Sequence, residues 1–421
     1  DYAEAQRDCK RSLKDTQMAY SDLFSADTGS FFRSPVRDIF KKVDLNSIYS
    51  FAGGYPSAET FPLDTFREIM SGVIDKYKGQ AFQYGATQGV TELRTALSAR
   101  YGVPMERIQI TSSSQQGIDV CTRVLVDPGD VILTSNPSYL GALQSFSSYR
   151  ADIRGVSHED DPERFRSAYT EAIEGILAEG KKIKFLYMIP DFQNPSGETL
   201  TLEERKILIS LAAEYGFVIV EDSPYRELRY EGTPVPTMYS LDPDRVLHLG
   251  SFSKVMAPGF RLGWIFAHPD LLDKIYVCKQ SLDLCPPVFD QYVAAEFLSS
   301  GLLDRNLEKS IRLYKGKRDL MLSMLREHMP DGVKWTHPEG GLFLFLTLPE
   351  YFDSVKFYDT ALGNGVAYVA GAFFNTLWVS GHRQPGKDGL NTMRMNFSFM
   401  SPDRIREGVI LLSSLLKDNL K

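Results

Sequence analysis

Residues 246–267 read VLHLGSFSKVMAPGFRLGWIFA, two apolar runs that a short polar loop separates. Each run is typical of a strand that is buried on both faces, as the strands of a parallel sheet are. Only nine residues, 252–260, join the two runs. Because a crossover between parallel strands needs about a dozen residues or more, the strand at 261–267 is predicted to run antiparallel to the strand at 246–251.

Similar apolar runs precede this pair, and amphipathic helices separate them. The best marked of these helices lies just before the apolar run at 217–222. It has a capping box at Thr201–Glu204, and Gly216 stands where it should end. The alternation of strands and helices from about residue 63 to 300 predicts a doubly wound α/β domain whose sheet is mostly parallel, with one antiparallel strand. The other predicted strands are DVILTS (130–135), KFLYMIP (184–190) and FVIVED (217–222).

The chain is expected to divide into three parts. Its 421 residues exceed the size at which a single hydrophobic core usually stops growing. Residues 1–50 resemble a helical N-terminal arm, and residues 51–300 form the large α/β domain. The mixture of strands and helices in residues 301–421 predicts a smaller α+β domain that packs with the arm.

Composition excludes several classes of function. The net charge of −7 argues against a nucleic-acid partner, which would require a basic face. The sequence has no apolar run of about 18 residues, so no membrane span is expected, and the polar start DYAEAQRDCK is unlike a signal peptide. The cysteines and histidines are too scattered for a disulfide framework or a metal site, which favours a cytoplasmic protein without metal. The four cysteines are Cys9, Cys121, Cys278 and Cys285.

Polar residues follow three of the predicted strands at the point where each strand ends. In an open α/β sheet, ligands bind outside these carboxyl ends. Asn194 follows 184–190, Asp222 and Tyr225 follow 217–222, and Lys254 follows 246–251. Taken alone, these residues could be a turn, a helix cap and an exposed loop lysine. Their arrival at one edge of one sheet favours a catalytic site instead.

An anion site is predicted beside them. The segment TSSSQQG (111–117) precedes a helix, and free N–H groups at a helix N-terminus attract anions. Neither a Walker A motif nor G-x-G-x-x-G occurs, so a phosphate monoester fits better than a nucleotide. The residues expected to hold it are Ser114, Gln115, Ser251, Ser253 and Arg261.

Together these motifs resemble the fold-type I pyridoxal-phosphate aminotransferases of classes I and II, and most of all the kynurenine and 2-aminoadipate aminotransferase branch. The resemblance covers nearly the whole chain. It rests on SPVRDIF, FAGGYPSAETFP, FQYGATQG, TSSSQQG, NPSY, QNPSG, EDSPY, SFSK followed by RLGW, and MRMNFS.

The resemblance implies pyridoxal 5'-phosphate as the cofactor and assigns roles around its ring. Lys254 forms the Schiff base and moves the substrate proton, since a neutral amine is both nucleophile and base. Asp222 pairs with the ring nitrogen and keeps the ring an electron sink. Tyr225 and Asn194 hydrogen-bond the phenolic oxygen of the ring, and Tyr139 stacks on the ring.

The resemblance also implies how substrate and subunits are arranged. Arg394 grips the substrate α-carboxylate in a bidentate manner, and Gly54 lines the entrance. Tyr84 reaches the cofactor phosphate of the neighbouring subunit, which makes a homodimer the expected unit.

Three departures from the family pattern concern the substrate. Ser223 stands where a second acid is common, and Ala370 stands where proline is common. The loop at 380–391 is long and is read as solvated, with His382 or Arg383 as the alternative contacts to a substrate side chain.

The predicted activity is transamination from an aromatic, kynurenine-like or 2-aminoadipate-like amino acid to a 2-oxo acid such as 2-oxoglutarate. One alternative uses the same cofactor for elimination, substitution or other biosynthetic chemistry. Another is a ligand-sensing module with a DNA-binding domain. The 50 residues before Phe51 are neither basic nor long enough for such a domain.

Overall fold

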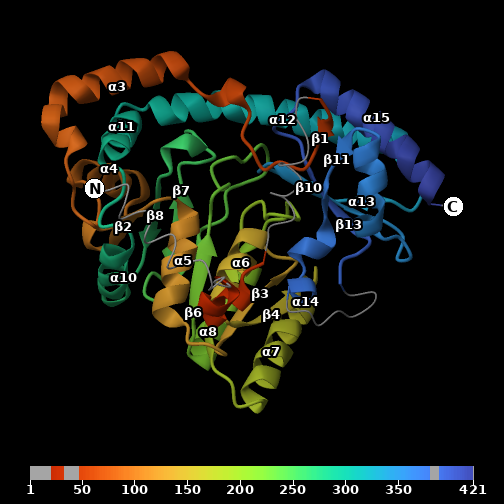
Figure 1. The fold of residues 1–421 in the computed structure, drawn as a ribbon, viewed down its shortest axis with the longest axis horizontal. Helices are drawn as coiled ribbons and strands as arrows, with labels where there is room; N and C mark the ends of the chain where they lie inside the picture. The colour runs from red at the N-terminus through yellow and green to blue at the C-terminus, as the bar shows by residue number, and fades with distance from the viewer. Residues whose placement is uncertain (1–19, 33–46, 380–387, 421) are drawn as a thin grey trace, which may run out of the picture.

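A seven-stranded sheet organises the larger part of the fold in the computed structural model, which describes residues 20–32, 47–379 and 388–420 (Figure 1). The strand order is β2-β8-β7-β6-β5-β3-β4. Strand β8 runs antiparallel to both of its neighbours and the other pairs are parallel, which confirms the reversed strand. The strands are β2 (Ile108–Thr111), β3 (Val131–Asn136), β4 (Asp152–Ser157), β5 (Ile183–Met188), β6 (Val218–Asp222), β7 (Val246–Ser251) and β8 (Gly263–Phe266).

Two strands of this sheet, β2 and β4, were not predicted. Strand β4 lies at the edge of the sheet and its residues range from buried to exposed. Strand β2 has only four residues and buries a glutamine, Gln109, whose amide nitrogen donates to the carbonyl of Thr87 at 2.7 Å. Neither strand has the long apolar run by which the other five were found.

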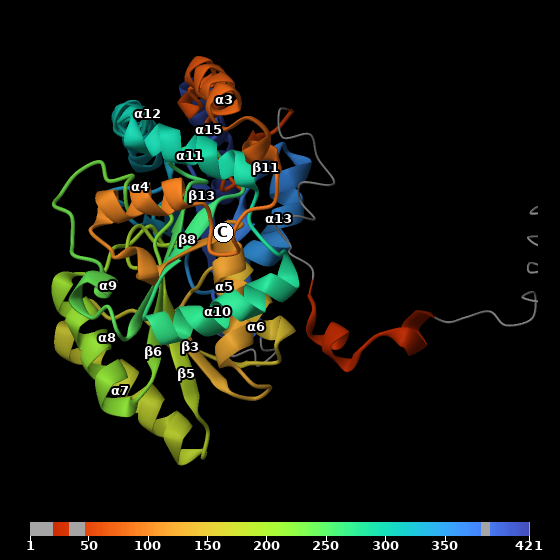
Figure 2. The ribbon, with the colours of Figure 1, turned by 90° about the vertical axis from the view of Figure 1, so that its left-hand side faces the viewer.

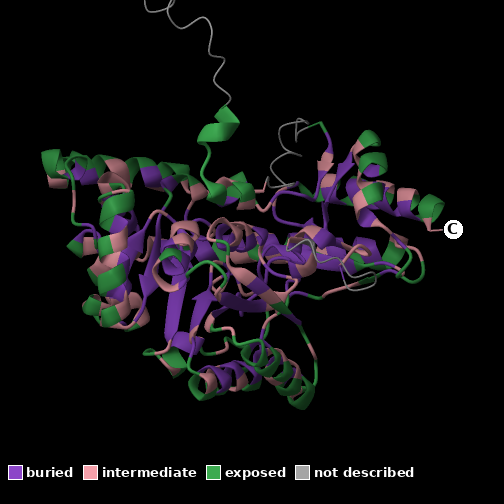
Figure 3. Cartoon of the chain, turned by 60° about the horizontal axis from the view of Figure 1, so that its bottom comes forward, coloured by how far each residue is buried: buried purple, intermediate pink, exposed green. Residues whose placement is uncertain are grey.

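Helices cover both faces of the large sheet. Helices α5 (Ser114–Leu125), α6 (Leu140–Ser148) and α10 (Pro269–Leu282) lie on one face. Helices α7 (Pro162–Ala178), α8 (Leu202–Tyr215) and α9 (Met238–Leu241) lie on the other. The strands between them are buried while the outward sides of the helices are exposed (Figure 3). This double cover explains why the central strands are apolar on both sides.

Helix α8 begins and ends where the sequence predicted. The Thr201 hydroxyl accepts the backbone N–H of Glu204 at 3.2 Å, and the Glu204 carboxylate accepts the backbone N–H of Thr201 at 2.6 Å. Gly216 ends the helix with φ 77° and ψ 35°, a left-handed conformation that favours glycine. The capping box and the terminating glycine are both confirmed.

A long helix, α12 (Leu302–His328), runs across the top of the molecule and joins its two parts (Figures 1 and 2). It packs against α11 (Val288–Ser299) and against the C-terminal helix α15 (Pro402–Asn419). Helices α3 (Leu63–Tyr77) and α4 (Thr91–Tyr101) lie beside α11. The 3₁₀ turns of the main body are Ala58–Thr60, Lys78–Phe82, Met105–Arg107, Pro258–Phe260 and Gly371–Phe374.

The C-terminal part has an antiparallel sheet in the order β12-β13-β10-β9. These strands are β9 (Lys334–Trp335), β10 (Phe343–Thr347), β12 (Val369–Ala370) and β13 (Thr392–Asn396), accompanied by helices α13 (Ser354–Gly363) and α14 (Thr376–Val379). Strand β1 (Tyr49–Ser50) pairs in parallel with β11 (Val366–Ala367) and packs beside α15. The division into 1–50, 51–300 and 301–421 stays a prediction.

Residues 20–32 of the N-terminal arm form two 3₁₀ turns, Tyr20–Leu23 and Ala26–Ser30. The Asp27 carboxylate pairs with Arg150 at 2.9 Å, which ties this segment to the end of α6. Within the ranges that the structure describes, no helix combines the length and the apolar character that crossing a membrane requires.

Thr201→Ala should lower the free energy of unfolding by about 1 kcal/mol, because the first turn of α8 loses its hydroxyl cap. Urea unfolding followed by circular dichroism measures the change. Thr360→Ala, an exposed position within α13, is the matched control and should be nearly neutral. Equal losses in the two variants would contradict the capping role of Thr201.

Candidate active site

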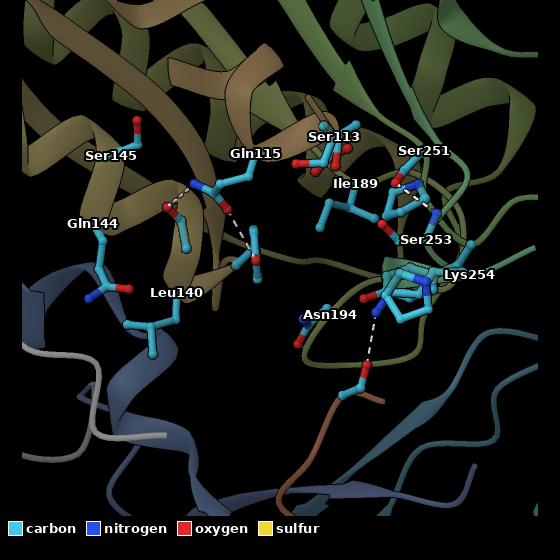
Figure 4. A pocket seen from close by; sticks show the side chains of 18 of the residues that line it. Ser113, Gln115, Leu140, Gln144, Ser145, Ile189, Asn194, Ser251, Ser253 and Lys254 are labelled. Atoms are coloured by element: carbon cyan, nitrogen blue, oxygen red, sulfur yellow. Dashed lines mark hydrogen bonds between the residues drawn. The ribbon is translucent and has the colours of Figure 1, made fainter. Parts of the chain in front are cut away.

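A cavity of about 940 Å³ opens where the carboxyl ends of β6 and β7 face the C-terminal sheet (Figure 4). It brings together side chains from the large sheet, from the loop before α3 and from β13. Every predicted site residue except Tyr84 lines it, namely Gly54, Ser114, Gln115, Tyr139, Asn194, Asp222, Tyr225, Ser251, Ser253, Lys254, Arg261 and Arg394.

Lys254 lies three residues beyond the end of β7 and points into the cavity (Figure 4). Its ammonium donates to the carbonyl oxygen of Gly54 at 2.8 Å. Burial, together with the positive charges of Arg394 and Arg261, lowers the pKa of Lys254 to about 8. A larger share of this amine is therefore neutral near physiological pH than in an ordinary lysine, as a nucleophile or a base requires.

Asp222 is the last residue of β6 and is almost fully buried. Its Oδ2 accepts a hydrogen bond from the Tyr187 hydroxyl at 2.9 Å, whereas its Oδ1 is buried without a partner. Burial raises the pKa of Asp222 to about 7, although the Tyr187 hydrogen bond and the nearby His248 oppose the shift. A carboxylate with one unsatisfied buried oxygen is suited to receive a cationic N–H donor.

Arg394 comes from the central strand β13 of the C-terminal sheet and is buried. Its guanidinium donates to Asn194 Oδ1 at 2.9 Å and to the carbonyl of Ala52 at 2.6 Å. The rings of Phe343 and Phe374 lie 4.4 and 4.9 Å from the guanidinium carbon. Its Nε has no partner, and burial lowers the pKa of the side chain to about 10. Such a desolvated guanidinium attracts a carboxylate strongly.

The N-terminus of α5 forms the anion-binding end of the cavity. Ser113 precedes the helix with φ 79°, and no side chain caps the first turn. Arg261 donates to the Ser113 hydroxyl at 2.7 Å, which places a positive charge beside the free N–H groups. A Cβ on Gly263 would lie 2.7–2.8 Å from the backbone of Ser113 and Ser114. Glycine is therefore required there for β8 to approach this turn.

Three further hydrogen bonds fix the walls of the cavity. The Ser251 hydroxyl accepts the backbone N–H of Ser253 at 3.1 Å (Figure 4). The Tyr139 hydroxyl donates to Gln115 Oε1 at 3.2 Å, and the Gln115 amide nitrogen donates to the carbonyl of Gly141 at 2.9 Å. The tyrosine ring and the first turn of α5 are thus held together.

Tyr84 lies away from the cavity at the surface, with 79% of its area exposed. Its predicted contact requires a second subunit and stays a prediction. The alternative substrate contacts His382 and Arg383 lie outside the described residues.

Several residues of the site escaped the sequence analysis. Tyr187 lies inside the predicted strand KFLYMIP, and a tyrosine in an otherwise apolar buried strand is the signal that could have identified it. Ser113 belongs to the TSSSQQG segment, but the sequence analysis assigned the phosphate to its neighbours Ser114 and Gln115. No local pattern marks the apolar wall, which consists of Phe32, Tyr55, Leu140, Ile189, Phe343 and Phe374.

The arrangement fits pyridoxal 5'-phosphate. The unsatisfied oxygen of Asp222 suits the nitrogen of a cationic ring, and the uncapped α5 N-terminus with Arg261 suits a phosphate. The amine of Lys254 suits an aldehyde. Among the described residues, no cluster of three or more histidine, cysteine or acidic side chains is placed to hold a metal ion.

Comparisons with known proteins agree with this fit. Residues 52–409 match the family model for aminotransferase class I and II. Aromatic-amino-acid aminotransferase 1 of Thermococcus litoralis is 42% identical over 99% of this chain and 100% of its own length. The 2-aminoadipate transaminase of Thermus thermophilus is 34% identical over 95% of this chain and 98% of its own. The structure of Pyrococcus horikoshii kynurenine aminotransferase superposes with a TM-score of 0.89 at 40% identity, covering 97% of this chain and all of that one. The chain therefore belongs to the class I and II aminotransferases, enzymes that use pyridoxal 5'-phosphate.

Proposed function

We propose that this aminotransferase moves the amino group of an aromatic amino acid to a 2-oxo acid such as 2-oxoglutarate. Kynurenine-like and 2-aminoadipate-like donors are the next candidates, since relatives carry those names. The observation that carries the proposal is the juxtaposition of Lys254 and Arg394 in one cavity, together with the apolar wall formed by the six residues named above.

When bound, pyridoxal 5'-phosphate supplies an electron sink for negative charge at the substrate Cα. In this proposal, Lys254 would hold the cofactor through its amine, and the same amine would be the base that takes the proton from the substrate Cα. Asp222 would keep the ring nitrogen protonated, Asn194 and Tyr225 would hold the ring oxygen, and Tyr139 would hold the ring. The phosphate is held by Ser114, Gln115, Ser251, Ser253 and Arg261.

Arg394 orients the substrate through its α-carboxylate. Phe343 and Phe374 lie close to the guanidinium carbon and restrict its orientation. The planar fork of an arginine then presents parallel N–H donors, which a lysine lacks. A bound carboxylate thus has its Cα held in a set orientation, which is how positioning contributes to rate.

The positive charges on the described cavity wall are assigned to the cofactor and to the substrate α-carboxylate. Of the lining residues that the structure describes, the cations are Lys254, Arg261 and Arg394. In this proposal each of the three has a role toward the cofactor or the α-carboxylate. A second carboxylate, whether on a 2-aminoadipate-like donor or on 2-oxoglutarate, would need a partner other than these three cations.

We further propose a cytoplasmic homodimer in which Tyr84 contacts the cofactor phosphate of the partner. Exposed aromatic surface near Tyr84 supports an interface, because Phe82 is 67% exposed while its other face stacks on Phe289 at 5.5 Å. The described cysteines Cys121, Cys278 and Cys285 are all free thiols, which suits a reducing compartment.

Incubation with aromatic, acidic and aliphatic donors plus 2-oxoglutarate tests the proposed reaction. An aromatic donor should give its oxo acid and glutamate in equal amounts and the highest kcat/KM, because its ring matches the apolar wall. Lys254→Ala should abolish turnover, while Lys274→Ala, which changes an exposed lysine, should not. Oxo acid or ammonia formed without glutamate would assign the chain to elimination or substitution chemistry.

Capture of pyridoxal 5'-phosphate by the cofactor-free enzyme should accelerate as the pH rises and level off above about 8, where Lys254 loses its proton. Stopped-flow absorbance measures this rate. In Arg394→Gln the midpoint should move to higher pH, since one positive charge that lowers the lysine pKa is removed. A midpoint near that of a free lysine, about 10.4, would contradict the proposed state of the amine.

The subunit arrangement predicts complementation between two inactive variants. Hybrid dimers of Tyr84→Ala and Lys254→Ala contain one site with both residues intact, if Tyr84 acts across the interface. Random mixing should then restore about one quarter of the wild-type sites, as expected for a twofold-symmetric dimer. Activity no higher than that of the separate variants would place the effect of Tyr84 within its own subunit.

A further inference from the structure

We propose that Tyr187 is a positioning residue, whose hydroxyl fixes the Asp222 carboxylate so that Oδ1 faces the cofactor ring nitrogen. The inference deepens the proposed function and rests on the role given there to Asp222. The hydroxyl itself touches neither the substrate nor the reacting atoms in this proposal.

The sheet places the two side chains together. Tyr187 lies on β5 opposite Val220 of the adjacent parallel strand β6, two residues before Asp222. Because side chains alternate along a strand, Val220 and Asp222 point to the same face. The hydroxyl donates to Asp222 Oδ2 at 2.9 Å, and this leaves Oδ1 as the buried oxygen without a partner.

Tyr187 is itself firmly held. It is 0% exposed, its backbone carbonyl accepts the Thr134 hydroxyl at 3.1 Å, and the Phe146 ring packs edge-on at 5.4 Å. Burial raises the pKa of the phenol well above its usual value, so it stays protonated and acts as the donor. A fixed donor on one oxygen prevents the carboxylate from exchanging its two oxygens by rotation.

The same hydrogen bond favours the charged carboxylate. Burial acts against the charge of Asp222, and the groups that favour the charge are the Tyr187 hydroxyl and His248 on β7. His248 Nδ1 lies 3.0 Å from the Glu221 carboxylate, so this ring nitrogen is engaged by another acid. The remaining titratable neighbours, Tyr225 in the following loop and Cys121 on α5, have pKa values raised by burial and stay neutral. Tyr187 is therefore the direct donor among the described neighbours of this carboxylate.

Tyr187→Phe in the holoenzyme tests the proposal, because it keeps the ring and removes the donor. The dissociation constant of pyridoxal 5'-phosphate should rise about tenfold, as expected for a hydrogen bond to a charged group. The pH below which affinity is lost should also move upward, because Asp222 takes up its proton more readily. Tyr169→Phe on α7, an equally buried tyrosine on the opposite face of the sheet, should change neither quantity.

A double-mutant cycle separates positioning from a general packing defect. In an Asp222→Ala background, Tyr187→Phe should leave cofactor affinity unchanged, because the carboxylate that it orients is gone. An undiminished tenfold loss in that background, or no loss in the wild-type background, would overturn the proposal. If Asp222→Ala alone leaves the affinity unchanged, the role of Asp222 fails as well, and the donor assays above still report independently on transamination.

Discussion

The backbone of residues 51–54 connects the parts of the fold that meet at the cavity. The N–H of Phe51 donates to Ala367 and its carbonyl accepts from Asn396, both at about 2.8–2.9 Å, which ties the segment to the C-terminal part. The next carbonyls, those of Ala52 and Gly54, accept hydrogen bonds from Arg394 and Lys254. One short extended segment thus sets where the guanidinium of Arg394 lies relative to the amine of Lys254. The cavity depends on this connection because its two halves come from different sheets.

The segment is anchored from behind by the long helix α12. Its buried Lys317 contacts the Ser57 hydroxyl at 3.3 Å and the Glu59 carboxylate at 3.0 Å, and the Tyr314 hydroxyl accepts the N–H of Ser57 at 2.9 Å. On the other side, the Ser398 hydroxyl donates to the carbonyl of Tyr55 at 2.7 Å. This loop is thereby held from both sides by hydrogen bonds, as a positioning role toward a substrate requires.

Sequence reasoning located the parts of the site that depend on strand ends. Asn194, Asp222 and Lys254 each lie at or just beyond the end of a recognisable apolar run. The reversed strand could also be derived, because the nine residues 252–260 are too few for a parallel crossover. The contacts of Tyr187 and of Phe343 could not be derived, because they arise from pairing between strands whose register no local pattern records. Strands β2 and β4 were missed for a related reason, since neither presents a long apolar run. Tyr84 belongs to a third class, since its role depends on a surface of another molecule.

Burial acts against the charged form of Lys254, Arg394 and Asp222, three ionisable groups that line the cavity. It lowers the pKa of Lys254 to about 8 and of Arg394 to about 10, and it raises that of Asp222 to about 7. In each case the folded protein bears a free-energy cost that a bound ligand can offset, with a carboxylate beside Arg394 and a cationic ring nitrogen beside Asp222. Ligand binding that relieves this cost also stabilises the folded state by mass action. The electrostatics that prepare the cavity for its cofactor therefore make the loaded enzyme more resistant to unfolding than the cofactor-free chain.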